Sequence, residues 1–212
     1  MTGNSKHQDK TASVELVERR LGRQNSKLCL YLDWIRNQAG VEVREYFTVT
    51  SCDHRERDAI HPLSTPTGVG ILPIREGQVG LIRTFRHPIR DWVWEVPRGF
   101  ADENEDIRTA ATRELLEETG LECAPDDMVE LGFHHPEAGI LRARIAIYAA
   151  TRCALKAEPE TGEIGLGDLA WIPFDTALAM ADQSEIQDPT TCIALYRLLR
   201  IGHIDARKDK RA

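Results

Sequence analysis

Glu114, Glu117 and Glu118 stand close together near the end of the segment "GFADENEDIRTAATRELLEETGL". Along a helix, at about 100° of rotation per residue, their carboxylates fall within an arc of roughly 100°. Small and apolar side chains share that side of the helix: Ile107, Ala110 and Ala111. Carboxylates at the edge of a core repel one another, and partial burial raises their pKa values. The pattern therefore requires a positive partner.

Two interpretations of the glutamates follow from spacing alone. A hard divalent cation such as Mg²⁺ or Mn²⁺, held by oxygen ligands, would remove the repulsion. The alternative is a surface cluster with ordinary i,i+4 partners. Arg113 points about 100° away around the helix, so it is better placed to brace one glutamate, or an acid elsewhere, than to neutralise all three. Both interpretations stay open at this point.

The glutamates need a helix and a core to hold them. The spacing predicts a helix that begins near Asp106 and stops at Gly120, a residue type that often follows a helix end. Short runs rich in β-branched and aromatic residues predict strands on both sides of it: "GVGILPI", "QVGLIRTFR", "WVWEVP", "MVELGFHH", "ARIAIYAATRC" and "LAWIPF". A last helix has Asp188 as its cap and Pro189 in its first position. This order predicts a mixed α/β domain over residues 67–205.

The N-terminal third has a different pattern. Residues 1–25 are polar and charged, and we expect a flexible tail there. Over residues 26–60, "KLCLYLDWIR" and "VEVREYFTVT" flank "NQAG", which is typical of an antiparallel hairpin. The polar, proline-containing stretch after Ser51 predicts a loop between this β element and the main domain.

Composition narrows the classes of function. The chain has 212 residues, a formal net charge of −7 and a pI near 5.5, which argues against a nucleic-acid binder that neutralises phosphates broadly. Five widely spread cysteines without a C-x-x-C pair predict reduced thiols and neither a disulfide framework nor a zinc site. There is no apolar run of membrane-spanning length and no hydrophobic core of a signal peptide, so we expect a cytoplasmic protein without a membrane partner.

The glutamate segment resembles the Nudix box, G-x5-E-x7-R-E-U-x-E-E-x-G-U, where U is aliphatic. All nine specified positions are filled, by Gly99, Glu105, Arg113, Glu114, Leu115, Glu117, Glu118, Gly120 and Leu121. The resemblance implies an α/β/α sandwich with a mixed sheet, plus the N-terminal antiparallel element. It also implies an enzyme that hydrolyses a nucleoside diphosphate linked to another moiety.

The resemblance also implies roles for residues of the box. Glu114, Glu117 and Glu118 would bind Mg²⁺, or Mn²⁺, with the main-chain carbonyl of Arg98 as a further ligand. Arg113 would orient the glutamates, and Glu105 would either serve at the helix start or support the metal ligands without binding the metal itself.

A carboxylate that positions the attacking water is also needed. In related ADP-ribose pyrophosphatases it often comes from a flexible loop after the box. The acidic loop here offers Glu158, Glu160 and Glu163, of which Glu163 is the leading candidate; Glu137 is the alternative. Each of these acids could also simply solvate its loop.

Features outside the box are similar to the ADP-ribose and nucleotide-sugar branch. Phe85-Arg86 and Glu95 to Gly99 match its lead-in, which implies that Arg86 contacts a phosphate or ribose and that Glu95 hydrogen-bonds the substrate. The alternatives are a surface ion pair and a strand-end polar residue. Pro136, 15 residues after Leu121, also fits this branch.

Two departures from the branch bear on the substrate. Arg98 stands where a small residue is common, and "HHPEAGILRAR" brings Arg142 and Arg144 close to the expected cleft. Both allow a larger or more anionic substrate, and Arg98 becomes a candidate substrate contact.

In this branch the N-terminal element pairs two subunits and stacks aromatic side chains on the base, which implies a homodimer. Tyr46 is the leading stacking candidate, followed by Trp34 and Phe47, although strand aromatics are more often core. His134 and His135 are adjacent strand residues that point to opposite faces, which argues against a paired-histidine metal site.

Three functions follow. The first is metal-dependent hydrolysis of ADP-ribose or a related nucleoside diphosphate sugar to a nucleoside monophosphate and a sugar phosphate. The second, within the same enzyme class, is hydrolysis of a dinucleoside polyphosphate or nucleoside triphosphate. The third is a nucleotide sensor that keeps the fold but does not cleave.

Overall fold

The computed structural model describes residues 14–52, 63–159 and 164–202. It divides the chain into two compact units. The first comprises the described part of Met1–Pro62 together with Glu137–Arg142, and the second comprises the described parts of Leu63–Pro136 and Ala143–Ala212. Each unit is described by itself below.

The N-terminal unit is a sheet in the order β1-β2-β3-β10. Its strands are β1 (Val14–Gln24), β2 (Leu28–Asn37), β3 (Glu42–Ser51) and β10 (Leu141–Arg142). β2 and β3 pair antiparallel, in agreement with the predicted hairpin. β1 pairs antiparallel with β2, and β10 adds in parallel to β3.

The expected flexible tail over residues 1–25 is wrong from Val14 onward. These residues form β1, which pairs with β2 along its length. Its high charge is compatible with a strand because charged side chains suit the edge of a sheet. Residues 1–13 lie outside the described part of the chain.

The expectation of reduced thiols throughout is also wrong for two cysteines. Cys29 and Cys52 form a disulfide, with their Cα atoms 5.3 Å apart although 23 residues separate them in sequence. Antiparallel pairing of β2 with β3 brings the two strand ends together, which sequence spacing does not reveal. Cys123, Cys153 and Cys192 are free thiols.

The second unit is built on a mixed sheet of the order β13-β5-β4-β11-β9, with β6 beside β5 and β7 beside β4. β4 pairs antiparallel with β5 and parallel with β11. Its strands are β4 (Gly68–Arg75), β5 (Gln78–Arg86), β6 (Asp91–Glu95), β7 (Arg98–Phe100), β9 (Met128–His134), β11 (Ile145–Ala150) and β13 (Leu166–Pro173). A small separate pair joins β8 (Leu121–Cys123) to β12 (Cys153–Leu155), and a short 3₁₀ turn, η1, spans Pro125–Asp127.

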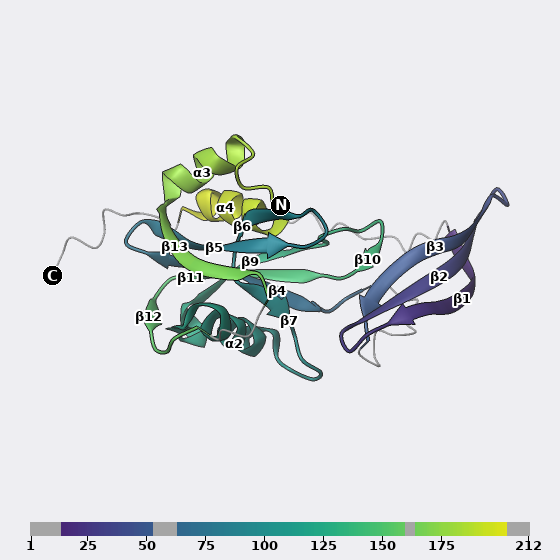
Figure 1. Ribbon diagram of the computed structural model, residues 1–212, viewed down its shortest axis with the longest axis horizontal. Coiled ribbons are helices and arrows are strands. Elements are labelled where there is room, and N and C mark those ends of the chain that lie inside the picture. The colour runs from purple at the N-terminus through teal and green to yellow at the C-terminus, as the bar shows by residue number, and fades with distance from the viewer. Residues whose placement is uncertain (1–13, 53–62, 160–163, 203–212) are drawn as a thin grey trace, which may run out of the picture. The chain divides into compact units, whose positions relative to one another are not determined.

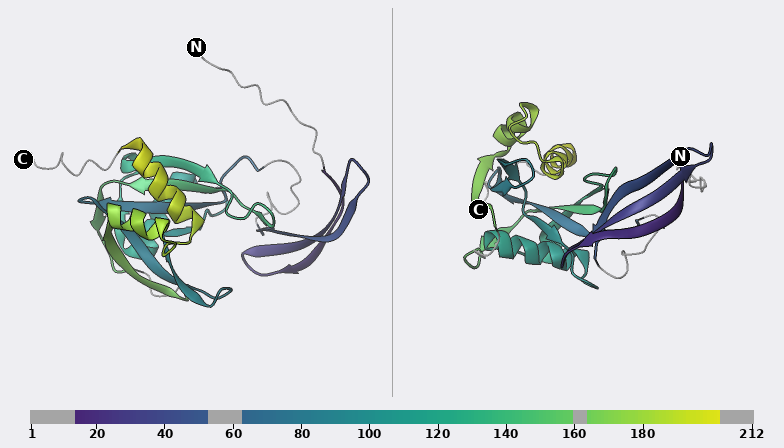
Figure 2. Two further views of the ribbon diagram at one scale, coloured as in Figure 1. Left: turned by 90° about the horizontal axis from the view of Figure 1, so that it is seen from above. Right: turned by 45° about the vertical axis from the view of Figure 1, so that its right-hand side comes forward.

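Helices cover both faces of this sheet. Figure 1 shows α2 (Ile107–Thr119) on one side and α3 (Phe174–Asp182) with α4 (Pro189–Ile201) on the other, and the right-hand view of Figure 2 keeps that separation. β4 supplies both cores because successive side chains alternate between faces. Val69 and Ile71 pack in the cluster with α2, whereas Leu72 and Ile74 pack in the cluster with α3 and α4. The α/β/α sandwich with a mixed sheet is confirmed.

Among the described residues, none of the helices combines the length and the apolar character that crossing a membrane would require.

Candidate active site

Helix α2 presents the glutamates, and its ends are where the sequence predicted them. Asp106 is the N-cap: its side chain accepts hydrogen bonds from the main-chain N–H groups of Arg108 (3.0 Å) and Thr109 (3.3 Å). The helix stops before Gly120, which has φ of 71°. A Cβ at Gly120 would lie 2.0 Å from the carbonyl oxygen of Ala157, so only glycine fits there.

Arg113 is the cation nearest to the glutamates. Its Nε and Nη2 donate to the two oxygens of Glu105, each at 2.9 Å. Its Nη1 donates to Glu114 at 2.8 Å and to Glu117 at 3.0 Å, and Nη2 also reaches the carbonyl of Phe100. Arg113 therefore braces three carboxylates at once, more than the single partner expected from its direction on the helix.

Two of the glutamates lie against strand β7. Glu118 accepts a hydrogen bond from the main-chain N–H of Arg98 at 2.8 Å, and both Glu114 and Glu118 are buried. Gly99 faces Glu114 so closely that a Cβ would lie 2.1 Å from its carboxylate. The glycine of the motif is thus explained by close approach, because any side chain would displace that carboxylate.

A second charged network continues from β7 to helix α4. The two terminal nitrogens of the Arg98 guanidinium have different partners: Nη2 donates to Glu95 at 2.7 Å, and Nη1 donates to Asp188 at 3.0 Å. Glu95 also accepts a hydrogen bond from Arg86, whose Nε lies 3.0 Å from both oxygens of the Glu95 carboxylate. Both acids are nearly fully buried, which makes these guanidinium partners necessary.

The electrostatics of the site follow from these pairs. Hydrogen bonding to Arg113 holds the pKa of Glu105 below its ordinary value, against the opposing effect of burial. The hydrogen bond to Glu105, followed by that to Glu114, raises the pKa of Arg113. Both shifts favour the charged form of each member of the pair.

The donor set suits a hard divalent cation by its chemistry. Two buried carboxylates, from Glu114 and Glu118, flank the main chain of Arg98 and Gly99, and oxygen donors of this kind are what Mg²⁺ and Mn²⁺ prefer. As arranged, the described residues contain no group of three or more His, Cys, Asp or Glu side chains gathered around one point. Arg113 supplies the local positive charge in this arrangement.

Comparison with known proteins decides the family. The family model for the NUDIX domain matches residues 64–191, more than half of the chain. The chain belongs to the Nudix family. It is accordingly a Nudix hydrolase, and enzymes of this family generally use divalent metals.

Several relatives share this domain. The CMP-5'-(N-acetyl-N-hydroxy-3-aminopropyl)phosphonate hydrolase of Streptomyces rubellomurinus (strain ATCC 31215) is 28% identical over 67% of this chain and 68% of its own length. The methanol dehydrogenase activator of Bacillus methanolicus is 32% identical over 63% and 72%, and the ADP-ribose pyrophosphatase of Bacillus subtilis (strain 168) is 23% identical over 68% and 77%. A solved structure described as an ADP compounds hydrolase matches with a TM-score of 0.69 at 16% identity, over 89% of this chain and 94% of that one, and so supports the fold.

Four acids were considered as the carboxylate that positions the attacking water, and they lie in different parts of the chain. Glu163 and Glu160 lie outside the described residues. Glu158 is described and exposed. Glu137 belongs to the N-terminal unit, where its carboxylate accepts from the N–H of Gly139 at 3.1 Å. The choice among them stays a prediction.

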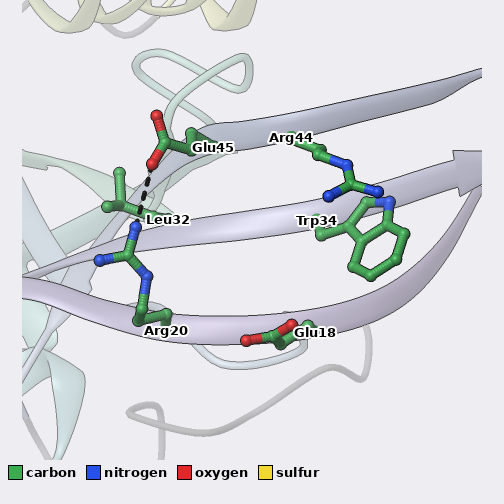
Figure 3. Close-up of a pocket in the computed structure, with 6 residues that line it drawn as sticks. All are labelled: Glu18, Arg20, Leu32, Trp34, Arg44 and Glu45. Carbon is green, nitrogen blue, oxygen red and sulfur yellow. Dashed lines mark hydrogen bonds and ion pairs between the residues drawn. The ribbon is translucent and has the colours of Figure 1, made fainter.

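Three aromatic residues of the N-terminal unit were predicted as candidates to stack on the base of a nucleotide, and their surroundings differ. The hydroxyl of Tyr46 donates to the carbonyl of Gly139, and Phe47 is half exposed. Trp34 lines a hollow of about 130 Å³ with Glu18, Arg20, Leu32, Arg44 and Glu45. Figure 3 shows the Arg44 guanidinium beside the Trp34 ring, 4.2 Å from its centroid. One face of this ring is therefore already occupied by a cation.

The adjacent histidines take separate partners; His134 is the last residue of β9, and His135 follows the strand. Nε2 of His134 is 3.0 Å from the hydroxyl of Thr190, and Nδ1 of His135 donates to the carbonyl of Ala143 at 2.7 Å. Burial lowers the pKa of His134. Of the two arginines suspected near the cleft, Arg144 lies over the ring of Phe133.

The sequence analysis treated Asp188 only as a helix cap, and it assigned Arg98 to the metal site through its carbonyl and to the substrate as a candidate contact, without linking the two residues. The structure joins the two side chains next to the Nudix glutamates. The available signal was a pair of opposite charges: Arg98 directly precedes the glycine of the Nudix box, and Asp188 stands at the start of the last helix. The two residues are 90 positions apart in the sequence, and nothing local indicated that they meet.

Proposed function

We propose that this Nudix hydrolase cleaves the pyrophosphate bond of ADP-ribose, or of a related nucleoside diphosphate sugar, to a nucleoside monophosphate and a sugar phosphate. The observation that carries the proposal is the pair of buried glutamates, Glu114 and Glu118, held against β7 beside Arg113. The similarity to the ADP-ribose pyrophosphatase of Bacillus subtilis supports the substrate class.

In this proposal Glu114, Glu117, Glu118 and the carbonyl of Arg98 hold Mg²⁺, which Mn²⁺ can replace. The bound cation would neutralise charge on the phosphate oxygens and assist deprotonation of water. Arg113 keeps Glu114 and Glu117 in place through the hydrogen bonds described above. The N–H of Arg98 does the same for Glu118.

Substrate contacts are assigned to the second network. Arg86 and Arg98 are partly exposed, whereas their shared partner Glu95 is buried. Their exposed guanidinium edges suit phosphate oxygens because an arginine fork donates two parallel hydrogen bonds. Glu95 then fixes both forks, and Glu163 is the proposed acid that positions the water. Tyr46 remains the proposed contact to the base.

The test is product formation by the full chain with and without Mg²⁺. The panel contains ADP-ribose, GDP-mannose, UDP-glucose, a diadenosine polyphosphate and dGTP. We expect AMP and ribose phosphate from ADP-ribose, only with the metal. Glu117→Gln and Glu118→Gln should each lower turnover on the order of 100-fold. Glu103→Gln, an exposed glutamate outside the fixed motif positions, is the matched control and should leave turnover unchanged.

Other outcomes of the panel would replace the proposal. Turnover confined to the polyphosphate or dGTP would favour the second enzyme function. Binding without cleavage of any compound would favour the nucleotide sensor. Because one relative is described as a hydrolase of a CMP-linked phosphonate, the panel should contain a sixth compound, a nucleoside monophosphate joined to a phosphonate.

We further propose that the chain forms a homodimer through its N-terminal unit. Strand β1 is an edge of that sheet, and Val14 and Leu21 on it are at least 40% exposed. An exposed edge with apolar side chains favours pairing with another chain. Sedimentation should give twice the 23.9 kDa chain mass, and Leu21→Lys should shift it toward the monomer. A monomeric wild-type chain would refute the dimer.

A further inference from the structure

Asp188 has two oxygens with two different tasks. Oδ2 accepts from the main-chain N–H of Thr191 at 2.8 Å and from its hydroxyl at 2.7 Å, which caps helix α4. Oδ1 accepts from Nη1 of Arg98 at 3.0 Å. A helix cap needs only the first set, so the second contact requires its own explanation.

In the contact between Asp188 and Arg98, the aspartate is the more deeply buried partner. The Asp188 side chain is 5% exposed and the Arg98 side chain 28%. An isolated carboxylate at that depth would be unfavourable, so the guanidinium is held firmly between Asp188 and the equally buried Glu95. Two fixed anions on two elements leave the Arg98 side chain little freedom.

The main chain of Arg98 is the other half of the connection. Its N–H donates to Glu118, and Arg98 lies in register with Gly70 of β4, one position before the glycine that faces Glu114. A shift of this peptide would therefore move the hydrogen bond to Glu118 and the close approach at Gly99 together. Asp188 and Glu95 hold the side chain of the same residue.

We infer that Asp188 is a positioning residue of the Nudix glutamate site, acting through Arg98 to fix the β7 peptide against which Glu118 and Glu114 lie. The inference rests on the proposed function, because it assigns a purpose to the position of those carboxylates. It adds helix α4 to the elements that build the metal site. It also gives the unusual Arg98 a role that a small residue at this position could not perform.

Replacing Asp188 by asparagine separates the two tasks. Asparagine caps helices as well as aspartate does, but it has one acceptor oxygen. With that oxygen on Thr191, its amide NH₂ faces the Arg98 guanidinium, and donor meets donor. Asp188→Asn thus keeps the cap and removes the link.

The experiment measures Mn²⁺ binding to the full chain by electron paramagnetic resonance, without nucleotide, together with thermal unfolding. For Asp188→Asn we expect about 10-fold weaker Mn²⁺ binding, the lower end of the range for residues that orient metal ligands. The unfolding temperature should stay close to that of the wild type. Asp175→Asn, an exposed aspartate in the first turn of α3, is the matched control and should change neither quantity.

A double-mutant cycle tests whether the effect runs through Arg98. Arg98→Met keeps an unbranched stem and removes the guanidinium. If Asp188 acts through Arg98, Asp188→Asn should weaken Mn²⁺ binding no further in the Arg98→Met background. Additive losses would show that Asp188 influences the site by another route and would overturn the inference.

The remaining outcomes are distinguishable. Wild-type binding of Mn²⁺ with unchanged affinity in Asp188→Asn would overturn the positioning role and leave the proposed function intact. A wild-type chain that binds no Mn²⁺ would overturn the metal site itself. Should Asp188→Asn fail to fold, Asp188→Ser retains a capping hydroxyl that is too short to reach Arg98, and the same 10-fold loss is expected of it.

Discussion

At the scale of single residues, the Glu105–Arg113 pair makes stability depend on pH. Hydrogen bonding to Arg113 depresses the pKa of Glu105 below its ordinary value in the folded chain. A depressed carboxylate stabilises the fold above its unfolded pKa, and that contribution is lost as the pH falls through the folded value. Glu105→Gln cannot ionise. Its deficit in unfolding free energy should be full at about pH 6 and should shrink below about pH 4.5.

Urea unfolding of the wild type and Glu105→Gln across this range is the measurement. Glu103→Gln, without such a partner among the contacts described, controls for the loss of any nearby charge. A deficit that stays constant from neutral to acidic pH would mean that the lost packing, and not the ion pair, explains the effect.

Gly99 should be irreplaceable for a steric reason. In Gly99→Ala the new methyl would overlap the Glu114 carboxylate, 2.1 Å away, so that carboxylate or β7 must move. Misplacement on the scale of 1 Å can lower an enzyme's rate about 100-fold. We expect such a loss in kcat/KM, measured on whichever substrate the panel identifies.

The control is Gly22→Ala in β1, where the nearest atom to the new methyl is Cγ of the Leu32 side chain at 3.3 Å. Its activity should stay at the wild-type level. A fully active Gly99→Ala enzyme would show that Glu114 can be placed elsewhere without harm.

At the scale of elements, helix α2 depends on its cap. Asp106 satisfies two N–H groups of the first turn, and replacing such a cap by alanine costs about 1 kcal/mol. Asp106→Ala should lower the free energy of unfolding by about that amount, whereas Asp106→Asn should lower it by a few tenths. Urea denaturation of both variants decides this, and equal losses would mean that the charge matters more than the hydrogen bonds.

The boundaries of α2 could be predicted because both signals are local. An aspartate stands before the first turn and a glycine follows the last one, and nine motif positions fix the spacing between them. The longer strands of the second unit were likewise evident from runs of apolar residues, whereas the three-residue strands β7, β8 and β12 were not predicted. Strand β1 was not, since its charges hide the alternation that pairing with β2 imposes.

Contacts between distant parts of the chain could not be predicted at all. Glu95 and Arg98 are three residues apart, and their pairing was within reach of sequence reasoning. Asp188 reaches Arg98 only because α4 begins beside β7 in the folded sheet. The Cys29–Cys52 bridge needs the register of β2 with β3, which no spacing rule supplies.

At the scale of the whole molecule, the two units are stabilised differently. The second unit has two apolar clusters, one on each face of its sheet. The N-terminal unit instead places a charged pair in its sheet: Arg19 donates to both oxygens of Asp33, at 2.8 and 2.7 Å, and Thr48 donates to the same carboxylate at 2.8 Å. Small sheets with little apolar core usually need a covalent cross-link for stability. The Cys29–Cys52 disulfide supplies such a cross-link in the N-terminal unit.

Reduction of this disulfide should therefore loosen the N-terminal unit selectively. Closing a loop of this size stabilises a fold by about 3 kcal/mol in the chain-entropy description, and Cys52→Ser or added reductant removes that contribution. Deuterium uptake in full-length protein, followed by mass spectrometry, should rise in peptides of β2 and β3 and stay unchanged in α2. Reductant should have no further effect on Cys52→Ser, while Cys192→Ser, which removes a free thiol, should respond to it as the wild type does. Uptake in β2 and β3 that ignores reductant in the wild type would show that the Arg19–Asp33 pair and the strand ladder stabilise this sheet without the bridge.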